Sequence, residues 1–142
     1  MVIMCPEKLH EYIWQGIRKE IRGDAIELYI PFYFGNGDET PLCLMWDKNG
    51  VLSDGGRALA ELEKRVGTVE PYIEKIRRIL NARGPVELVA GHKLAVRQFQ
   101  TVIDPCGEYV DYRAAVSRLI AAISLISVID TVNISDDGEV SV

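Results

Sequence analysis

The residue types and spacing that could do chemistry come together in one segment, Ser53-Asp54-Gly55-Gly56-Arg57. An acid and a base flank two glycines where an alternating strand pattern ends and a helical pattern begins. Three hypotheses fit this corner segment. Capping preferences favour a structural role, in which Asp54 or Ser53 caps the helix and the glycines make a sharp turn. Alternatively, exposed backbone N–H groups beside Arg57 bind a carboxylate or phosphate, or Asp54 acts as a metal ligand or base.

The remaining sequence supplies few partners for catalysis at this corner. It contains no P-loop, no dinucleotide fingerprint and no Gly-x-Ser-x-Gly motif. The only histidines are His10 and His92, and the cysteines Cys5, Cys43 and Cys106 include no CxxC pair. We therefore expect no metal, no cofactor and no catalytic residues, and we expect reduced thiols in a cytoplasmic protein.

Composition indicates one ordinary globular domain. The chain has 142 residues, of which 48% are hydrophobic and 26% are charged, and both fractions are close to globular averages. The net charge of −5 argues against a general binder of phosphate backbones, which normally carries a basic excess. The strongest membrane candidate, residues 119–129, is far shorter than the ~20 residues that span a bilayer. We therefore expect no membrane segment.

The periodicity of apolar residues predicts the elements that position the corner segment. Helices are predicted at residues 6–22, from 54 or 57 to 67, at 71–84 and at 109–130. Strands are predicted at residues 25–34, 42–47, 51–52, 86–90 and 94–99, with an Asn49-Gly50 hairpin turn between the second and third. Consecutive strands are joined by hairpins, so the sheet should be antiparallel and the class α+β.

We predict a single α+β domain over residues 1–130. Its antiparallel sheet, built from hairpins, packs against an N-terminal helix, two middle helices and a long apolar C-terminal helix. Residues 131–142 form an acidic tail that is either mobile or a peripheral strand.

The last predicted helix is apolar on nearly all sides, which indicates burial from several directions. Either it is the central helix packed on the sheet, or its second face, with Leu125, Val128 and Ile129, meets another subunit. The second face of the first strand carries Tyr29 and Tyr33, and it is either covered by a helix or meets a partner. These surfaces predict a homo-oligomer, such as a dimer, or a protein partner.

The two middle helices carry a cluster of basic residues. Its members are Lys64, Arg65, Lys75, Arg77, Arg78 and Arg83. Because glutamates are interleaved with them, the simplest interpretation is a pair of solvated faces with helical ion pairs. A local nucleic-acid patch is the alternative, since the total charge does not preclude a basic face.

Three segments carry a resemblance to a known family. They are the strand at 26–34, the hairpin that ends in Ser53-Asp54-Gly55-Gly56, and the helical segment Ala58-Leu59-Ala60-Glu61-Leu62. In order and spacing they resemble a bacterial and phage family catalogued only as a domain of unknown function, number 1828. The helix at 73–84, the segment at 86–90 and the closing helix with residues 119–123 are also similar in order and spacing. The likeness extends over residues 24–130. It implies a prokaryotic or mobile-element origin, and it brings no accepted activity and no catalytic residues.

The leading hypothesis is a non-enzymatic interaction domain that self-associates and binds a protein partner. The alternative is a small enzyme or ligand-binding protein that uses the corner segment, with Asp54 and Arg57 as polar anchors. Nucleic-acid binding through the basic middle helices is the third hypothesis.

Overall fold

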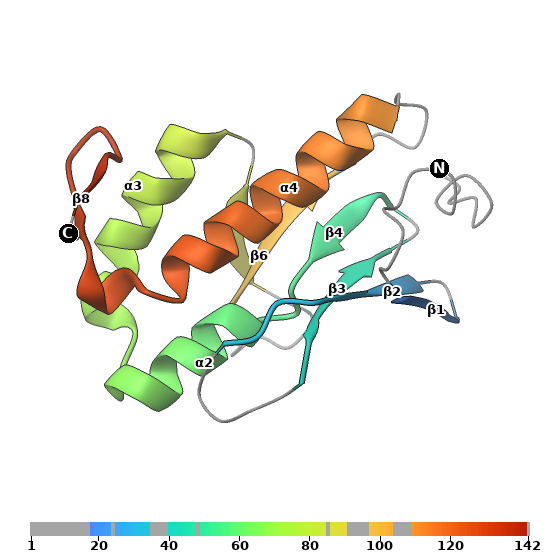
Figure 1. Cartoon of the computed structure of the whole chain (residues 1–142), viewed down its shortest axis with the longest axis horizontal. Helices are drawn as coiled ribbons and strands as arrows, with labels where there is room; N and C mark the ends of the chain where they lie inside the picture. Colours follow the sequence, from blue (N-terminus) through green and yellow to red (C-terminus); the bar gives the residue numbers. More distant parts are fainter. Residues whose placement is uncertain are drawn as a thin grey trace.

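The computed structural model describes residues 18–23, 25–34, 40–47, 49–84, 86–90, 97–103 and 109–141. Within these residues the chain is an α+β domain, in which three α-helices lie over a six-stranded sheet (Figure 1). The order of the strands is β1-β2-β3-β4-β6-β5, and every neighbouring pair is antiparallel. The predicted class is confirmed at this level.

The bounds of the elements are as follows. The large sheet consists of β1 (Arg18–Arg22), β2 (Ala25–Ile30), β3 (Leu42–Trp46), β4 (Val51–Ser53), β5 (Glu87–Ala90) and β6 (Arg97–Val102). The α-helices are α2 (Arg57–Val66), α3 (Ile73–Arg83) and α4 (Tyr109–Ile126), and the 3₁₀ turns are η1 (Glu70–Tyr72) and η2 (Ile129–Thr131). A small second sheet pairs β7 (Asn133–Ile134) with β8 (Val140–Ser141).

The core lies between the large sheet and the helices. Alternate residues of β2 and β3 are apolar, and they meet as buried cross-strand pairs such as Leu28 with Leu44 and Ile26 with Trp46. Both α2 and α4 contact β6, and α3 contacts α4, so the three helices form one layer. The fully buried Phe99 of β6 lies in this core.

The prediction of an N-terminal helix at residues 6–22 is wrong over residues 18–22. Residues 18–22 form β1, which pairs with β2 so that Lys19 lies opposite Leu28 and Ile21 opposite Ile26. Gly23, at φ +59°, lies in the connection to β2 instead of ending a helix. The helical spacing of apolar residues was overridden by cross-strand pairing, which local periodicity does not register. Residues 6–17 lie outside the described part of the chain.

The prediction of a long C-terminal helix that is apolar on all sides is also wrong. The helix α4 ends at Ile126, before the predicted end at residue 130. Small or polar residues at three- and four-residue steps, Ser117, Ala121 and Ser124, form an exposed stripe, while Leu119 and Ile123 are buried. The helix is therefore amphipathic, because alanine and serine on its outer side tolerate water.

The C-terminal segment packs against α3 (Figure 1). Arg78 donates a hydrogen bond of 3.2 Å to the carbonyl of Ile134 and pairs with Asp136 at 3.0 Å. Gly138 is buried so close to α3 that a Cβ atom added there would lie 2.3 Å from the Cβ of Ala82. Of the two alternatives for residues 131–142, a mobile tail or a peripheral strand, this segment adopts the second as the β7–β8 hairpin.

Candidate functional site

The carboxylate of Asp54 joins three elements at the corner segment. One oxygen, Oδ1, accepts hydrogen bonds from the backbone N–H groups of Gly56 and Phe99, both at 3.0 Å. The other, Oδ2, accepts from Ala58 N–H in the first turn of α2 at 2.9 Å. Asp54 is only 4% exposed. Its side chain therefore fixes the end of β4, the start of α2 and the middle of β6 relative to one another.

Burial has the largest effect on the pKa of the Asp54 carboxyl. It raises the pKa of Asp54 above the ordinary value of 3.8, while the hydrogen bonds from Ala58, Gly56 and Phe99 act in the opposite direction. A raised pKa is common among functional acids, but a structural carboxyl in a closed site has the same property. Because three backbone N–H groups donate hydrogen bonds to it, the buried Asp54 carboxylate is satisfied without a bound substrate.

The glycines of the corner make the turn that this geometry needs. Gly55 has φ +63° and Gly56 has φ +89°, a region that L residues with a Cβ rarely adopt. The N–H groups at positions 56 and 58 donate to the Asp54 carboxylate, and Arg57 N–H donates to the Asp54 carbonyl at 3.2 Å. Because Asp54 itself uses the N–H groups of residues 56–58, the arrangement favours the capping hypothesis over an anion site.

Arg57 is committed to neighbours within the chain. Its Nε donates to Glu61 Oε1 at 2.9 Å, and its guanidinium lies 5.2 Å from the centroid of the Phe34 ring. Glu61 is buried and also pairs with Lys64 at 3.2 Å. The Arg57 side chain therefore links Phe34 to α2. For Arg57 to bind a ligand, these contacts would have to break.

The predicted interface residues differ in how exposed they are. Val128 is 43% exposed and Tyr33 is 53% exposed, whereas Leu125 and Tyr29 are half-buried. The hydroxyl of Tyr29 donates to the Glu27 carboxylate within the same strand. Ile129 is fully buried in the core, so it is not available to another subunit.

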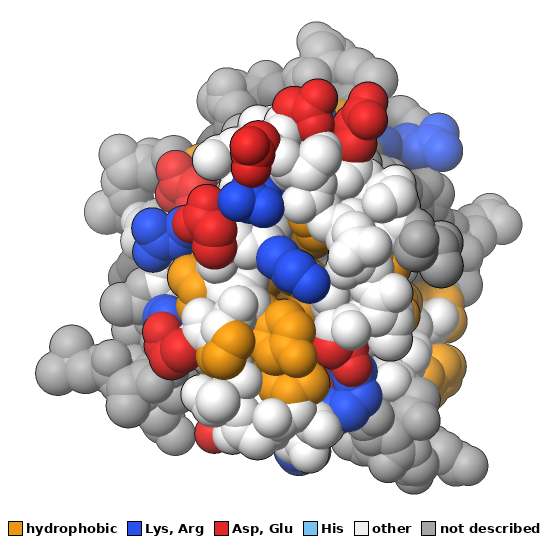
Figure 2. Space-filling model, turned by 90° about the vertical axis from the view of Figure 1, so that its left-hand side faces the viewer, with side chains coloured by type: hydrophobic (Ala, Val, Ile, Leu, Met, Phe, Trp, Pro, Cys, Tyr) orange, Lys and Arg blue, Asp and Glu red, His pale blue; other side chains and the backbone are white. Residues whose placement is uncertain are grey.

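The basic cluster of the middle helices is largely neutralised. Lys64 pairs with Glu61, Arg65 with Asp130, and Arg78 with Glu74 and Asp136. Lys75 donates to the carbonyl of Val132 at 3.3 Å and lies over the Tyr72 ring. Figure 2 shows acidic and basic side chains interspersed around a hydrophobic patch on the left-hand side of the molecule. This pattern supports the interpretation of the basic cluster as helical ion pairs. The side chain of Arg83, the last member of the cluster, lies outside the described residues.

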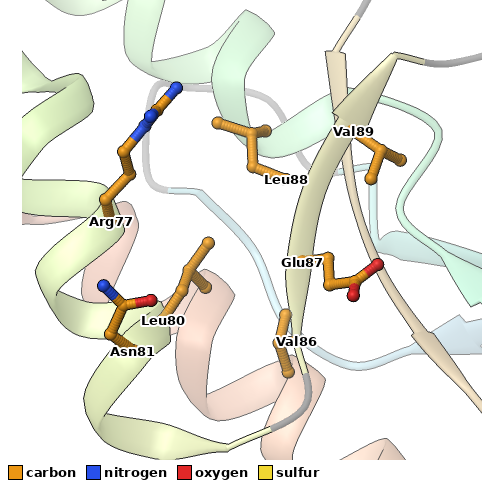
Figure 3. A pocket seen from close by; sticks show the side chains of 7 residues that line it. All are labelled: Arg77, Leu80, Asn81, Val86, Glu87, Leu88 and Val89. Atoms are coloured by element: carbon orange, nitrogen blue, oxygen red, sulfur yellow. The ribbon is translucent and has the colours of Figure 1, made fainter.

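A groove between α3 and β5 is the feature that the sequence did not indicate. It has a volume of about 450 Å³, and its helical wall is formed by Arg77, Leu80 and Asn81. Residues 86–89 form the opposite wall. Figure 3 shows Leu88 directed toward the side of α3, whereas Glu87 and Val89 point away from it. The groove thus runs along the outer edge of β5.

The two edges of the large sheet differ in chemistry. The strand β1 has the sequence RKEIR, in which four of five residues are charged. The strand β5 has the sequence ELVA, and it pairs with β6 on one side and with no other described strand. Charged side chains commonly protect an exposed edge from pairing with another chain. The edge at β5 has one charged residue, Glu87, among four, so it is less protected than β1 and is the best candidate for a functional site.

No group of three or more His, Cys, Asp or Glu side chains in the described part of the chain is positioned to hold a metal ion. His10, His92, Cys5 and Cys106 lie outside the described residues. None of the helices in the described ranges has the length and apolarity to cross a membrane.

Comparison with known proteins adds no relative: no protein-family model, curated protein or solved structure matches the chain. The resemblance to the domain of unknown function number 1828 therefore stays a prediction.

Proposed function

We propose that this protein is an interaction module that binds an extended segment of a partner protein by strand addition at β5. The observation that carries the proposal is an edge strand in which three of four residues are apolar, with a groove beside it. Extended segments add to such edges because their main-chain groups complete the hydrogen bonds that the edge strand leaves open. Among the described residues, no group of three or more His, Cys, Asp or Glu side chains is positioned to hold a metal ion.

The backbone of β5 supplies the directional part of the interaction. In an antiparallel pair, alternate residues direct N–H and C=O toward the neighbouring strand, and the others direct them outward. About half of the backbone groups of β5 therefore face away from β6 and need water or a partner as their hydrogen-bond partner. With four residues at about 3.3 Å each, β5 offers a pairing length of about 13 Å.

Both walls of the groove supply the apolar part of the interaction. Leu80 of α3 and Val86 before β5 are buried at the base of the groove, and Leu88 is half-buried above them. Alternate side chains of an added strand would point into this base, so the preferred segment has apolar residues at every second position. A contact this small is typical of transient recognition instead of permanent assembly.

Selection of peptides on the purified protein tests the proposal. We expect a displayed library of random nine-residue peptides to yield binders with alternating apolar residues. The substitution Val89→Lys places a charge on the outer edge and should weaken binding by about tenfold or more. Val102→Lys is the matched control, because Val102 is 63% exposed on β6, away from that edge.

Three outcomes are informative. Enrichment of no peptide, or equal loss of binding in both variants, contradicts strand addition at β5. A second copy of the chain is the other possible occupant of the edge. Sedimentation that shows a dimer which Val89→Lys dissociates would assign the edge to self-association and overturn the assignment to a partner segment.

A further inference from the structure

Arg77 differs in its contacts from Lys75 and Arg78, the other cations of α3 whose side chains the structure describes. Lys75 and Arg78 are held by the C-terminal segment and by nearby acids. Arg77 is exposed on the helical wall of the groove, and no acidic group in the described part of the chain pairs with it. Glu87 lines the same groove, but Figure 3 shows its carboxylate turned away from α3. The groove therefore carries an unneutralised positive charge.

Asn81 lies one helical turn after Arg77 on the same wall. Residues four apart share one face of a helix, and Leu80 lies between them at the apolar base. Figure 3 shows Arg77 and Asn81 along α3 with Leu80 directed toward β5. The wall thus presents a guanidinium and an amide above an apolar base.

On the basis of the proposed function, we infer that the segment bound at β5 carries a carboxylate that Arg77 binds, with Asn81 as a second donor. A guanidinium offers parallel N–H donors that match the two oxygens of a carboxylate. An amide NH₂ group adds donors that a carboxylate, which only accepts, can use. The carboxylate comes either from an aspartate or glutamate side chain within the segment or from the C-terminus of the partner.

The test uses four synthetic peptides of eight residues that alternate threonine and valine. Three are blocked at both ends and differ only at one interior position, which is glutamate, glutamine or lysine. The fourth has the interior glutamine and a free C-terminal carboxylate. Binding is measured by titration at low salt, and the backbone amide NMR signals of residues 87–90 report whether each peptide lies at the edge of β5.

We expect one of the two carboxylate peptides to bind about tenfold more tightly than the blocked glutamine peptide. A charge-assisted hydrogen bond typically contributes a gain in affinity of this size. The carboxylate peptide that gains this affinity identifies the source, internal or terminal. The preference should fall to within about twofold in Arg77→Gln. Lys64→Gln is the matched control, because it removes one positive charge from an exposed site on α2 and should keep the preference.

The failure of this inference is distinguishable from failure of the proposed function. If all four peptides shift the β5 amide signals with equal affinity, strand addition holds and the carboxylate recognition is wrong. A carboxylate preference that survives in Arg77→Gln also overturns it. If no peptide shifts the β5 signals, both the inference and the proposed function are contradicted.

Discussion

Asp54 and Phe99, 45 residues apart in the sequence, are joined by two hydrogen bonds. The Asp54 carboxylate accepts from Phe99 N–H at 3.0 Å, and Asp54 N–H donates to the Phe99 carbonyl at 3.2 Å. The same carboxylate caps α2 through Ala58. The corner segment therefore acts as the junction between β4, β6 and α2, and β6 in turn carries the edge strand β5.

Removal of this junction should destabilise the whole domain. In Asp54→Ala three buried N–H groups lose their acceptor, at about 1–3 kcal/mol each, so we predict a loss of about 3 kcal/mol in the free energy of unfolding. Urea denaturation measures it. A variant that keeps the stability of the parent protein but loses a specific activity or ligand would instead support the hypothesis of a catalytic or binding corner.

The stability should also depend on pH through Asp54. Because burial raises its pKa in the folded state, the folded protein holds this proton more tightly than the unfolded chain. The contribution is thus fully present below the ordinary pKa of 3.8, and it is lost as pH rises through the raised pKa. The measurement is the difference in stability between the parent protein and Asp54→Asn across this range, since other groups cancel in that difference. The parent protein should lose stability relative to Asp54→Asn as pH rises. If it gains stability relative to Asp54→Asn instead, the raised pKa of Asp54 is contradicted.

Alanine substitutions at Gly67 and Gly138, which have nearly the same φ, distinguish the energetic cost of backbone strain from the cost of overpacking. Gly67 has φ +89° with no atom within 4 Å of an added Cβ, whereas at Gly138, with φ +86°, the Cβ would lie 2.3 Å from Ala82. Gly67 has ψ −46°, a combination with positive φ that L residues populate sparsely, so we predict a cost of about 1–3 kcal/mol for Gly67→Ala from conformation alone. Gly138→Ala should cost about 1–3 kcal/mol more from overpacking.

The packing cost has a local signature. Hydrogen exchange should accelerate across the β7–β8 hairpin in Gly138→Ala, because the hairpin must move away from α3, and it should stay slow there in Gly67→Ala. Equal stability of the two variants would show that residues 133–141 do not pack on α3 in solution.

Several elements follow from local patterns. The alternation of Leu42, Leu44 and Trp46 predicts β3, and Gly67 and Gly84 correctly end α2 and α3. The Asn49-Gly50 turn is correct in place, but the connection spans residues 47–50 and only Gly50 has positive φ among its described residues. Asp47, which accepts from the N–H groups of Asn49 and Val51, provides the turn chemistry that a tight primed turn would not need.

The features that decide function are non-local. The hairpin of β5 and β6 was predicted, but its position was not, because β6 joins β4 through pairs such as Val51 with Val102 that no short-range pattern encodes. That insertion leaves β5 at the edge and creates the groove beside Arg77. From the sequence, Arg78 has Glu74 four residues before it, whereas its pairing with Asp136 depends on the packed C-terminal segment and could not be predicted.

Amide hydrogen exchange of β5, with and without a selected peptide, tests strand addition most directly. The outward-facing N–H groups of β5 should exchange fast in the protein alone and slow by at least about tenfold when the peptide pairs with them. The amides of β1 at the opposite edge should not change. Slowing at β1 or elsewhere, with β5 unaffected, would contradict the account.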